Sequence, residues 1–224
     1  MTFGALQSHL MYNLVIMQNT IDKILNEGIT TLGFKISSET QNNFFAFIEL
    51  LQKWNKVINL TAITETEEIV VKHILDSLAI APYLKGKSIL DFGTGAGLPG
   101  IPLALVFPQY NFTLLDSNNK KISFLNQVVL NLKLGNVKVI LSKVEQFNFA
   151  SGFDTIIARA VGSLRDIIIL TRHLLSPKGQ LLVMKGKYPE NELDEISNLA
   201  KIKIHQLKVP YLNAERHLVC ITLI

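Results

Sequence analysis

A glycine-rich stretch limits the possible folds of this 224-residue chain more than any other part of it: Asp91-Phe-Gly-Thr-Gly-Ala-Gly-Leu-Pro-Gly100. A short apolar run typical of a buried strand, 88–90, precedes it, and a second apolar run that can begin a helix, 101–106, follows it. Four glycines allow positive φ angles and let backbone N–H groups approach a ligand at the start of a helix. The pattern therefore predicts a strand, a ligand-binding turn and a helix.

The acidic residue at the start of this stretch indicates the charge of the ligand. Residues 95–100 match the G-x-G-x-x-G pattern of dinucleotide-binding loops. Asp91 would then place a carboxylate beside a pyrophosphate, and two like charges ~4 Å apart cost about 1 kcal/mol in water and several times more at a lower effective dielectric constant. S-adenosylmethionine carries a sulfonium, an ammonium and no phosphate, so it suits the loop better. A nucleotide-dependent oxidoreductase is the alternative.

Strand and helix patterns alternate along the rest of the chain. After the loop we expect strands at 111–116, 137–141, 153–158, 179–184, 202–209 and 217–223, and helices at 117–132, 163–175 and 190–200. Repeated strand–helix units predict a mostly parallel sheet with helices on both faces and ligands at the carboxyl ends of the strands. Residues 86–224 are therefore expected to form an α/β domain with a seven-stranded sheet.

Helical patterns fill the residues before the loop. A short helix is expected at 21–29, ending near Gly28, and a longer one begins at Ser38, where Gln41 completes a capping box. Apolar residues at helical spacing continue this helix, with charged residues on its other face. We predict that residues 21–85 form an N-terminal helical region that packs on the sheet.

A third helix is expected at 67–80. His73 and Asp76 lie three residues apart on it, so their side chains share a face and can form a hydrogen bond. No further cluster of His, Cys, Asp or Glu has metal-ligand spacing, and we expect no metal site. Residues 1–20 are interpreted as a lead-in without an assigned function.

The composition favours a soluble protein of the cytoplasm. No apolar run approaches the length of a membrane span, and the first residues lack the basic start of a secretory signal. The single cysteine, Cys220, has no partner, which suits a reducing compartment. Charge is uneven, with a balance of −3 over residues 1–80 and +7 over residues 81–224. The basic second part is compatible with a polyanionic partner.

Two charged residues close predicted strands at the sheet edge where ligands bind. Asp116 ends the second strand, where it would meet the ribose hydroxyls of a bound nucleoside. Arg159 ends the fourth, apolar strand and requires an anionic or aromatic partner. Its candidate partners are a carboxylate of the cofactor, an RNA phosphate, Asp154 or Asp166.

Seven ordered motifs bear on the family: Trp54-Asn-Lys-x-x-Asn59-Leu-Thr61, His73-Ile-Leu-Asp-Ser77, the loop 91–100, Leu114-Leu-Asp-Ser117, Arg159-Ala160, Lys185-Gly186 and Glu215-Arg-His-Leu218. Together they closely resemble glucose-inhibited division protein B, the bacterial small-subunit ribosomal RNA methyltransferase G family. The resemblance runs from about residue 20 to the end of the chain.

This resemblance implies a class I, Rossmann-like methyltransferase fold, S-adenosylmethionine as the methyl donor and N7 of a guanine in 16S ribosomal RNA as the acceptor. The family's cofactor contacts would fall on Gly93, Leu98, Val144, Glu145 and Arg159, beside the loop residues Asp91 and Gly95 and the ribose acceptor Asp116. From the residues alone, the segment 144–145 would be interpreted as a solvated loop. The resemblance makes it an adenine-side contact.

Transfer to a guanine N7 needs no general base, because this nitrogen has a free lone pair at neutral pH. We therefore assign no catalytic residue, and Arg159, Lys185 and Arg216 are hypothesised to position phosphate or base. A monomer acting on a small-subunit particle or precursor is expected. The alternatives are a methyltransferase of another RNA or of a small molecule, and a noncatalytic RNA-binding module.

Overall fold

The computed structural model describes residues 19–224, so most of the lead-in expected at 1–20 lies outside the described residues. Within them, a seven-stranded sheet has the order β3-β2-β1-β4-β5-β7-β6. The strands are β1 (Ser88–Phe92), β2 (Asn111–Asp116), β3 (Val137–Leu141), β4 (Phe153–Arg159), β5 (Leu175–Lys185), β6 (Ala200–Gln206) and β7 (His217–Leu223). Strands β1 to β5 run parallel to one another, and β7 is antiparallel to β5 and β6. The expected mostly parallel sheet is confirmed.

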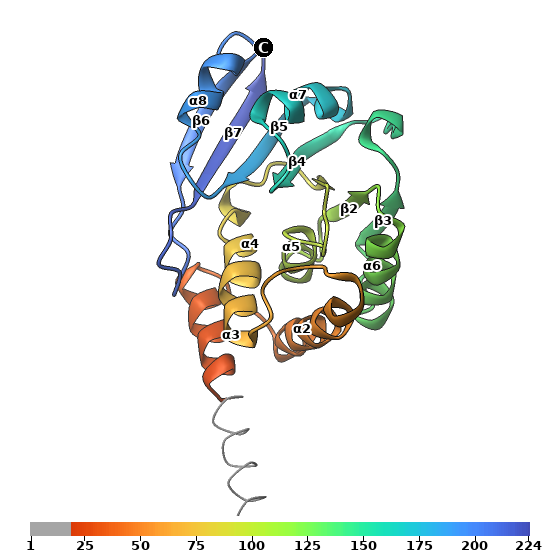
Figure 1. Cartoon of the computed structure of the whole chain (residues 1–224), viewed down its shortest axis with the longest axis vertical. Helices are drawn as coiled ribbons and strands as arrows, with labels where there is room; N and C mark the ends of the chain where they lie inside the picture. The colour runs from red at the N-terminus through yellow and green to blue at the C-terminus, as the bar shows by residue number, and fades with distance from the viewer. Residues whose placement is uncertain (1–18) are drawn as a thin grey trace, which may run out of the picture.

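Helices cover both faces of this sheet (Figure 1). The described elements before β1 are a helix at 19–31, α2 (Ser38–Ile58), α3 (Thr66–Ile69), the π-helix η1 (Val70–Leu75), α4 (Asp76–Leu78) and the 3₁₀ turn η2 (Ala81–Tyr83). The later ones are α5 (Gly100–Val106), α6 (Asn119–Asn131), η3 (Val144–Gln146), α7 (Leu164–Thr171), η4 (Arg172–Leu174), α8 (Glu190–Leu193) and η5 (Asp194–Ile196). None of the helices in 19–224 is long and apolar enough to cross a membrane.

The helices before β1 share one hydrophobic core with α5 and α6, whereas α7 and η5 pack in a second core on the other face. The ring of Phe124 on α6 joins the two parts of the first core. It lies 6.4 Å from the ring of Phe47 and 5.9 Å from that of Trp54, centroid to centroid. Residues 19–85 therefore pack directly on the sheet domain, and the boundary at residue 85 stays a prediction.

Some helix ends differ from those expected. The first helix continues past Gly28 to residue 31, because this glycine serves packing: a Cβ there would lie 2.8 Å from Cδ2 of Leu75. Ser37, not Ser38, caps α2 by accepting a hydrogen bond from the Thr40 N–H. Asn118 caps α6. Each of these two caps lies one residue away from the helix start expected at 38 or 117, a difference that sequence spacing alone does not resolve.

Strand β5 begins at Leu175, before the expected residue 179. Its register against β4 shifts between Phe153, which pairs with Leu175, and Thr155, which pairs with Gln180. This irregularity lets the segment containing Pro177 enter the sheet, although proline and glycine there signal a turn. Strand β6 ends at Gln206, because the following residues leave the sheet and bury Leu207 and Val209 in the first core.

Candidate active site

The glycine loop between β1 and α5 leaves space for a ligand to approach its backbone closely. Gly95 has φ of 59°, and the nearest atom to a Cβ built on it would be a backbone oxygen 3.9 Å away, so the space above it is free. Gly100, at the start of α5, differs, because a Cβ there would lie 2.7 Å from Oδ2 of Asp91. One glycine therefore leaves room for a ligand and the other leaves room for the carboxylate beneath the loop.

Asp91 lies under this loop and is 1% exposed. Its Oδ2 accepts hydrogen bonds from the Thr94 hydroxyl, at 2.7 Å, and from the Gly100 N–H, at 2.8 Å, while its Oδ1 is buried without a partner. Burial raises the pKa of this carboxyl to about 6, although both hydrogen bonds and the charge of Arg159 act in the other direction. An unpaired buried carboxylate oxygen is unfavourable unless a ligand supplies a donor or a positive charge, so the residues present fit a cationic cofactor.

Asp116 ends β2 beside the same loop. Its Oδ2 accepts the Gly95 N–H at 3.0 Å, its Oδ1 accepts the Asn118 N–H at 2.9 Å, and Nζ of Lys121 lies 3.6 Å from Oδ2. The carboxylate thus ties the glycine loop to the next strand. Each oxygen keeps a further lone pair, and the role of Asp116 as ribose acceptor stays a prediction.

The loop opens into a cavity of about 380 Å³, here called the β2–β3 cavity. It brings together four of the predicted cofactor contacts, Gly93, Asp116, Val144 and Glu145. The last two lie in the turn η3 after β3, where Val144 is buried and Glu145 is exposed. The wall at this end therefore combines a buried apolar side chain with polar and charged ones, a mixture that suits a nucleobase.

Leu98 is one of three predicted cofactor contacts, with Asp91 and Gly95, that line neither this cavity nor the larger one described next. The side chain of Leu98 is 4% exposed and packs in the first hydrophobic core. A ligand contact at this position would have to come from the backbone. The role of Leu98 stays a prediction.

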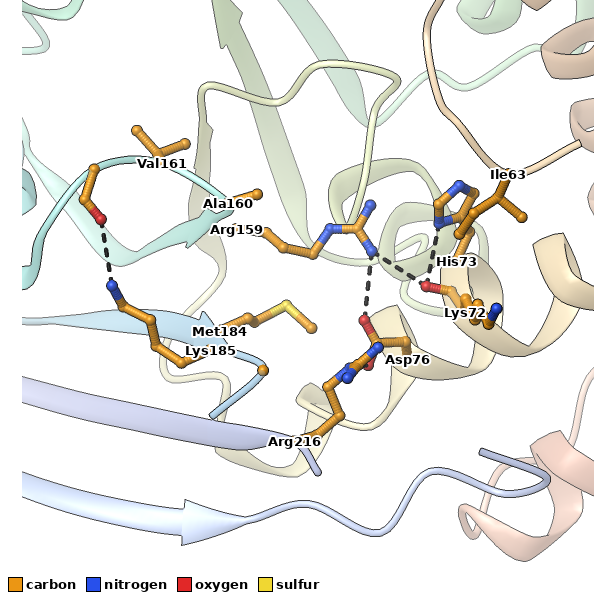
Figure 2. A pocket seen from close by; sticks show the side chains of 12 residues that line it. Ile63, Lys72, His73, Asp76, Arg159, Ala160, Val161, Met184, Lys185 and Arg216 are labelled. Carbon is orange, nitrogen blue, oxygen red and sulfur yellow. Dashed lines mark hydrogen bonds and ion pairs between the residues drawn. The ribbon is translucent and has the colours of Figure 1, made fainter. Parts of the chain in front are cut away.

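A second cavity, of about 600 Å³, adjoins the first, and Val161 lines both. We call it the β4–β5 cavity, because its walls include the ends of β4 and β5 together with the helical segment η1–α4 and the residue before β7 (Figure 2). The lysines and arginines among its lining residues are Lys72, Arg159, Lys185 and Arg216, and the carboxylate among them is Asp76.

Asp76 joins two of these cations. Its Oδ1 accepts a hydrogen bond from Nε of Arg216 at 2.8 Å, and its Oδ2 lies 3.4 Å from Nη1 of Arg159 (Figure 2). Nη1 of Arg159 also lies 3.5 Å from the carbonyl oxygen of Lys72. The protein partner of Arg159 is therefore Asp76, which the sequence analysis did not consider for this role.

The prediction that Asp154 or Asp166 is the protein partner of Arg159 is wrong, because both carboxylates bind other groups. Asp154 accepts the N–H groups of Lys87 and Ser88 at the start of β1. Asp166 accepts the hydroxyl hydrogen bond of Ser163 at the start of α7. Both lie close to Arg159 in the sequence, but each binds groups near its own position in the fold.

The hydrogen bond expected between His73 and Asp76 is also absent. Nδ1 of His73 lies 3.1 Å from the carbonyl oxygen of Lys72, so Nδ1 carries the proton and Nε2 accepts the hydroxyl hydrogen of Thr61 at 2.8 Å. Burial lowers the pKa of His73 to about 4, and the charge of Arg159 acts in the same direction. His73 is thus a neutral side chain that anchors the loop after α2. His73 lies within the π-helical turn η1, which ends directly before Asp76, and the wider π-helical turn changes the α-helical spacing on which the expectation depended.

The loop after α2 is the part of the site that sequence reasoning missed. Asn55 binds both backbone groups of Thr61, donating to its carbonyl oxygen and accepting its N–H, each at 2.8 Å. Together with His73 this places Ile63 in the wall of the β4–β5 cavity. The polar motif at 54–61 was the available signal, although nothing in it shows that its amide binds the backbone.

Lys185 reaches the β4–β5 cavity with its ammonium already engaged. Nζ lies 2.8 and 2.9 Å from the two carboxylate oxygens of Glu192 and 3.3 Å from the carbonyl oxygen of Gly162. Glu192 also accepts the N–H of Leu164 at 2.7 Å. These contacts tie α8 to the loop between β4 and α7. The hypothesis that Lys185 positions RNA stays a prediction.

Comparison with known proteins identifies relatives of this chain. The family model described as rRNA small subunit methyltransferase G matches residues 40–219. The ribosomal RNA small subunit methyltransferase G of Coxiella burnetii is 51% identical over 195 residues, covering 87% of this chain and 95% of that protein. The protein of the same name from Salmonella arizonae is 43% identical, covering 92% and 98%.

Solved structures show the same architecture at low sequence identity. The glycopeptide N-methyltransferase MtfA in complex with S-adenosylmethionine has a TM-score of 0.58 at 8% identity, covering 68% of this chain and 87% of that one. A SAM-dependent methyltransferase from Aquifex aeolicus has a TM-score of 0.54 at 16% identity, covering 70% and 93%. The expected Rossmann-like methyltransferase fold is confirmed.

Proposed function

Because the chain belongs to the rRNA small subunit methyltransferase G family, we propose that it transfers the methyl group of S-adenosylmethionine to N7 of a guanine in 16S ribosomal RNA. One observation carries this proposal. A cavity that suits a cationic nucleoside adjoins, at Val161, a cavity whose walls hold four lysine and arginine side chains. The first has the chemistry to bind the donor and the second has the charge to bind an RNA strand.

The residues of the glycine loop and the β2–β3 cavity would hold the donor. S-adenosylmethionine supplies an electrophilic methyl group on a sulfonium. The unpaired Oδ1 of Asp91 offers an acceptor and a negative charge to its cationic groups, and the open backbone at Gly95 permits close approach. Asp116 and the segment 144–145 would contact the ribose and the base.

The β4–β5 cavity would hold the guanine without removing a proton from it. N7 attacks through its own lone pair, so the protein contributes position rather than acid–base chemistry, worth up to roughly 7–11 kcal/mol in favourable cases. The neutral imidazole of His73 agrees with this, because both of its nitrogens are engaged in holding the loop after α2. Arg159 and Arg216 present cationic groups to the phosphates of the strand.

We further propose that the enzyme acts in the cytoplasm, as a monomer, on a small-subunit particle or precursor. The charge balance of +7 over residues 81–224 supports a polyanionic partner of this kind. The cations that line the β4–β5 cavity all belong to this part of the chain except Lys72.

Transfer of a radiolabelled methyl group tests the proposal. The purified protein is incubated with labelled donor and with small-subunit RNA, both naked and in particles from a strain that lacks the modification, and the product is mapped. We expect label on N7 of a single guanine. Label on no RNA despite measurable donor binding would contradict the substrate and would direct the search to small-molecule acceptors. Absence of both labelling and donor binding would favour a noncatalytic RNA-binding module.

A further inference from the structure

We propose that Asp76 is a positioning residue, whose carboxylate holds Arg159 and Arg216 at one wall of the β4–β5 cavity so that their other N–H groups bind a phosphate of the RNA substrate. The proposal rests on the proposed function for the identity of the anion. It goes beyond that function by assigning the group that arranges the two arginines.

The three residues reach one point from distant parts of the chain. Asp76 begins α4, Arg159 ends β4, and Arg216 directly precedes β7. Figure 2 shows both guanidinium groups directed toward the same carboxylate, at 2.8 Å from Arg216 and 3.4 Å from Arg159. The backbone at each arginine is already fixed, since Arg159 pairs with Met184 of β5 and the carbonyl oxygen of Arg216 accepts the Leu207 N–H. What the carboxylate adds is the direction of the two side chains.

Charge and burial explain why a carboxylate is favourable between the two arginines. Asp76 is 3% exposed, and two guanidinium groups beside it would repel each other without a negative charge between them. Burial lowers the pKa of Arg159, and the charge of Arg216 acts in the same direction, whereas Asp76 opposes both. One carboxylate with two arginines leaves a net positive charge at the wall, which suits an anionic ligand.

Donors remain on both arginines after these contacts. Arg216 uses Nε for Asp76 and Nη1 for the carbonyl oxygen of Glu215, and Arg159 uses Nη1 for Asp76 and Lys72. In the part of the chain that the structure describes, the buried side-chain nitrogens and oxygens without a partner are Oδ1 of Asp91 and Nδ1 of His217. The remaining guanidinium nitrogens are therefore accessible, and both residues line the cavity. Phosphate oxygens are the acceptors that such planar donor groups favour.

The substitution Asp76→Asn tests this by removing the charge at nearly constant size, and Glu67→Gln is its control. Glu67 is exposed on α3, so both variants lose one negative charge in the same helical segment, but Glu67→Gln leaves the arginines in place. At saturating donor we expect Asp76→Asn to lower kcat for RNA methylation at least about tenfold, since small misplacements have effects of this size. Non-specific RNA affinity should fall in neither variant. A kcat of Asp76→Asn within about threefold of the control would overturn the proposal.

A double-mutant cycle separates positioning from an independent effect. If Asp76 acts through Arg216, the substitution Arg216→Ala lowers kcat/KM in the wild-type background but changes it by less than about twofold in the Asp76→Asn background. Losses that multiply in the double variant would mean that the two residues act separately, and the proposal would be wrong. Arg159→Ala provides a second, parallel cycle.

One further measurement uses the wild-type protein, so it does not depend on whether Asp76→Asn folds. Arginine side-chain ¹⁵N NMR should show a slowly exchanging Nε–H for Arg216, assigned by its loss in Arg216→Lys. Its absence from the folded wild-type protein would overturn the proposal even if RNA is methylated. Conversely, a protected Nε–H in a protein that labels no RNA would leave the carboxylate–arginine arrangement standing and place the failure with the proposed substrate. Binding of inorganic phosphate, followed by the same resonance, then decides whether the wall binds an anion.

Discussion

Two buried carboxylates in the active site differ in what surrounds them. Asp91 has hydrogen-bond donors on one oxygen and none on the other, whereas Asp76 has a guanidinium group on each oxygen. The first is therefore poised to receive a positive charge, and the second is already neutralised. At the scale of single residues, this difference in partners determines how each carboxylate responds to ligands.

Cofactor affinity should depend on the ionisation of Asp91. Its raised pKa, about 6, means that the carboxyl is protonated in acid, where it offers no negative charge to the donor. We expect the affinity for S-adenosylmethionine to fall by up to about tenfold per pH unit as the pH drops below 6. Calorimetric titrations between pH 5 and 7, where the donor's ammonium stays charged, measure this. The substitution Asp91→Asn should bind weakly and without this pH dependence, and an equally steep dependence in that variant would contradict the assignment.

The stability of the fold should depend on His73. Its pKa is about 4 in the folded protein and near 6.5 in the unfolded chain, so only the unfolded chain takes up a proton between these values. Stability is therefore lost as the pH falls from 6.5 toward 4, by up to about 3 kcal/mol for a shift of this size. Urea unfolding at pH 7 and pH 5 measures the loss. His73→Gln, which keeps a hydrogen-bonding side chain, should reduce it, and an unchanged pH dependence would show that other groups cause it.

At the scale of elements, α2 joins the N-terminal helices to the sheet domain. Phe47 is fully buried against Phe124 of α6, whereas Val57 on the same helix is 78% exposed. We expect Phe47→Ala to lower the free energy of unfolding by about 3–5 kcal/mol, as other buried aromatic truncations do. Val57→Ala, the control, should change it by less than about 0.5 kcal/mol. Equal effects in denaturant unfolding would mean that α2 does not pack as described.

At the scale of the whole molecule, RNA binding should depend on which cations are free. Arg216 shares one carboxylate with a second arginine, whereas the ammonium of Lys185 is held by both oxygens of Glu192. Replacing Arg216 with Ala should therefore reduce the slope of log affinity against log salt by about one. Lys185→Ala should reduce it less, and so should the control Lys201→Ala on the edge strand β6. An equal loss for Lys185 would show that it leaves Glu192 to bind RNA.

Much of the architecture was predictable from local patterns. The bounds of β2, β3 and β7 agree with those expected, because each is a short run rich in strand-forming residues between turn signals. The position of the glycine loop was also predicted correctly, because its positive φ angles and close contacts admit few residues other than glycine. The start of β5 was missed, because its pairing depends on an irregular register with β4. No local signal encodes such a register.

The amino-acid sequence by itself determined the order of strands and helices, the loop that can receive a cofactor and the family to which the chain belongs. These follow from the residue types and from their spacing along the chain. Only the tertiary structure decided the partners: Arg159 pairs with Asp76 rather than with Asp154 or Asp166, and His73 with Thr61. Those contacts join residues of different elements, and their geometry exists only after the sheet has brought the strand ends together.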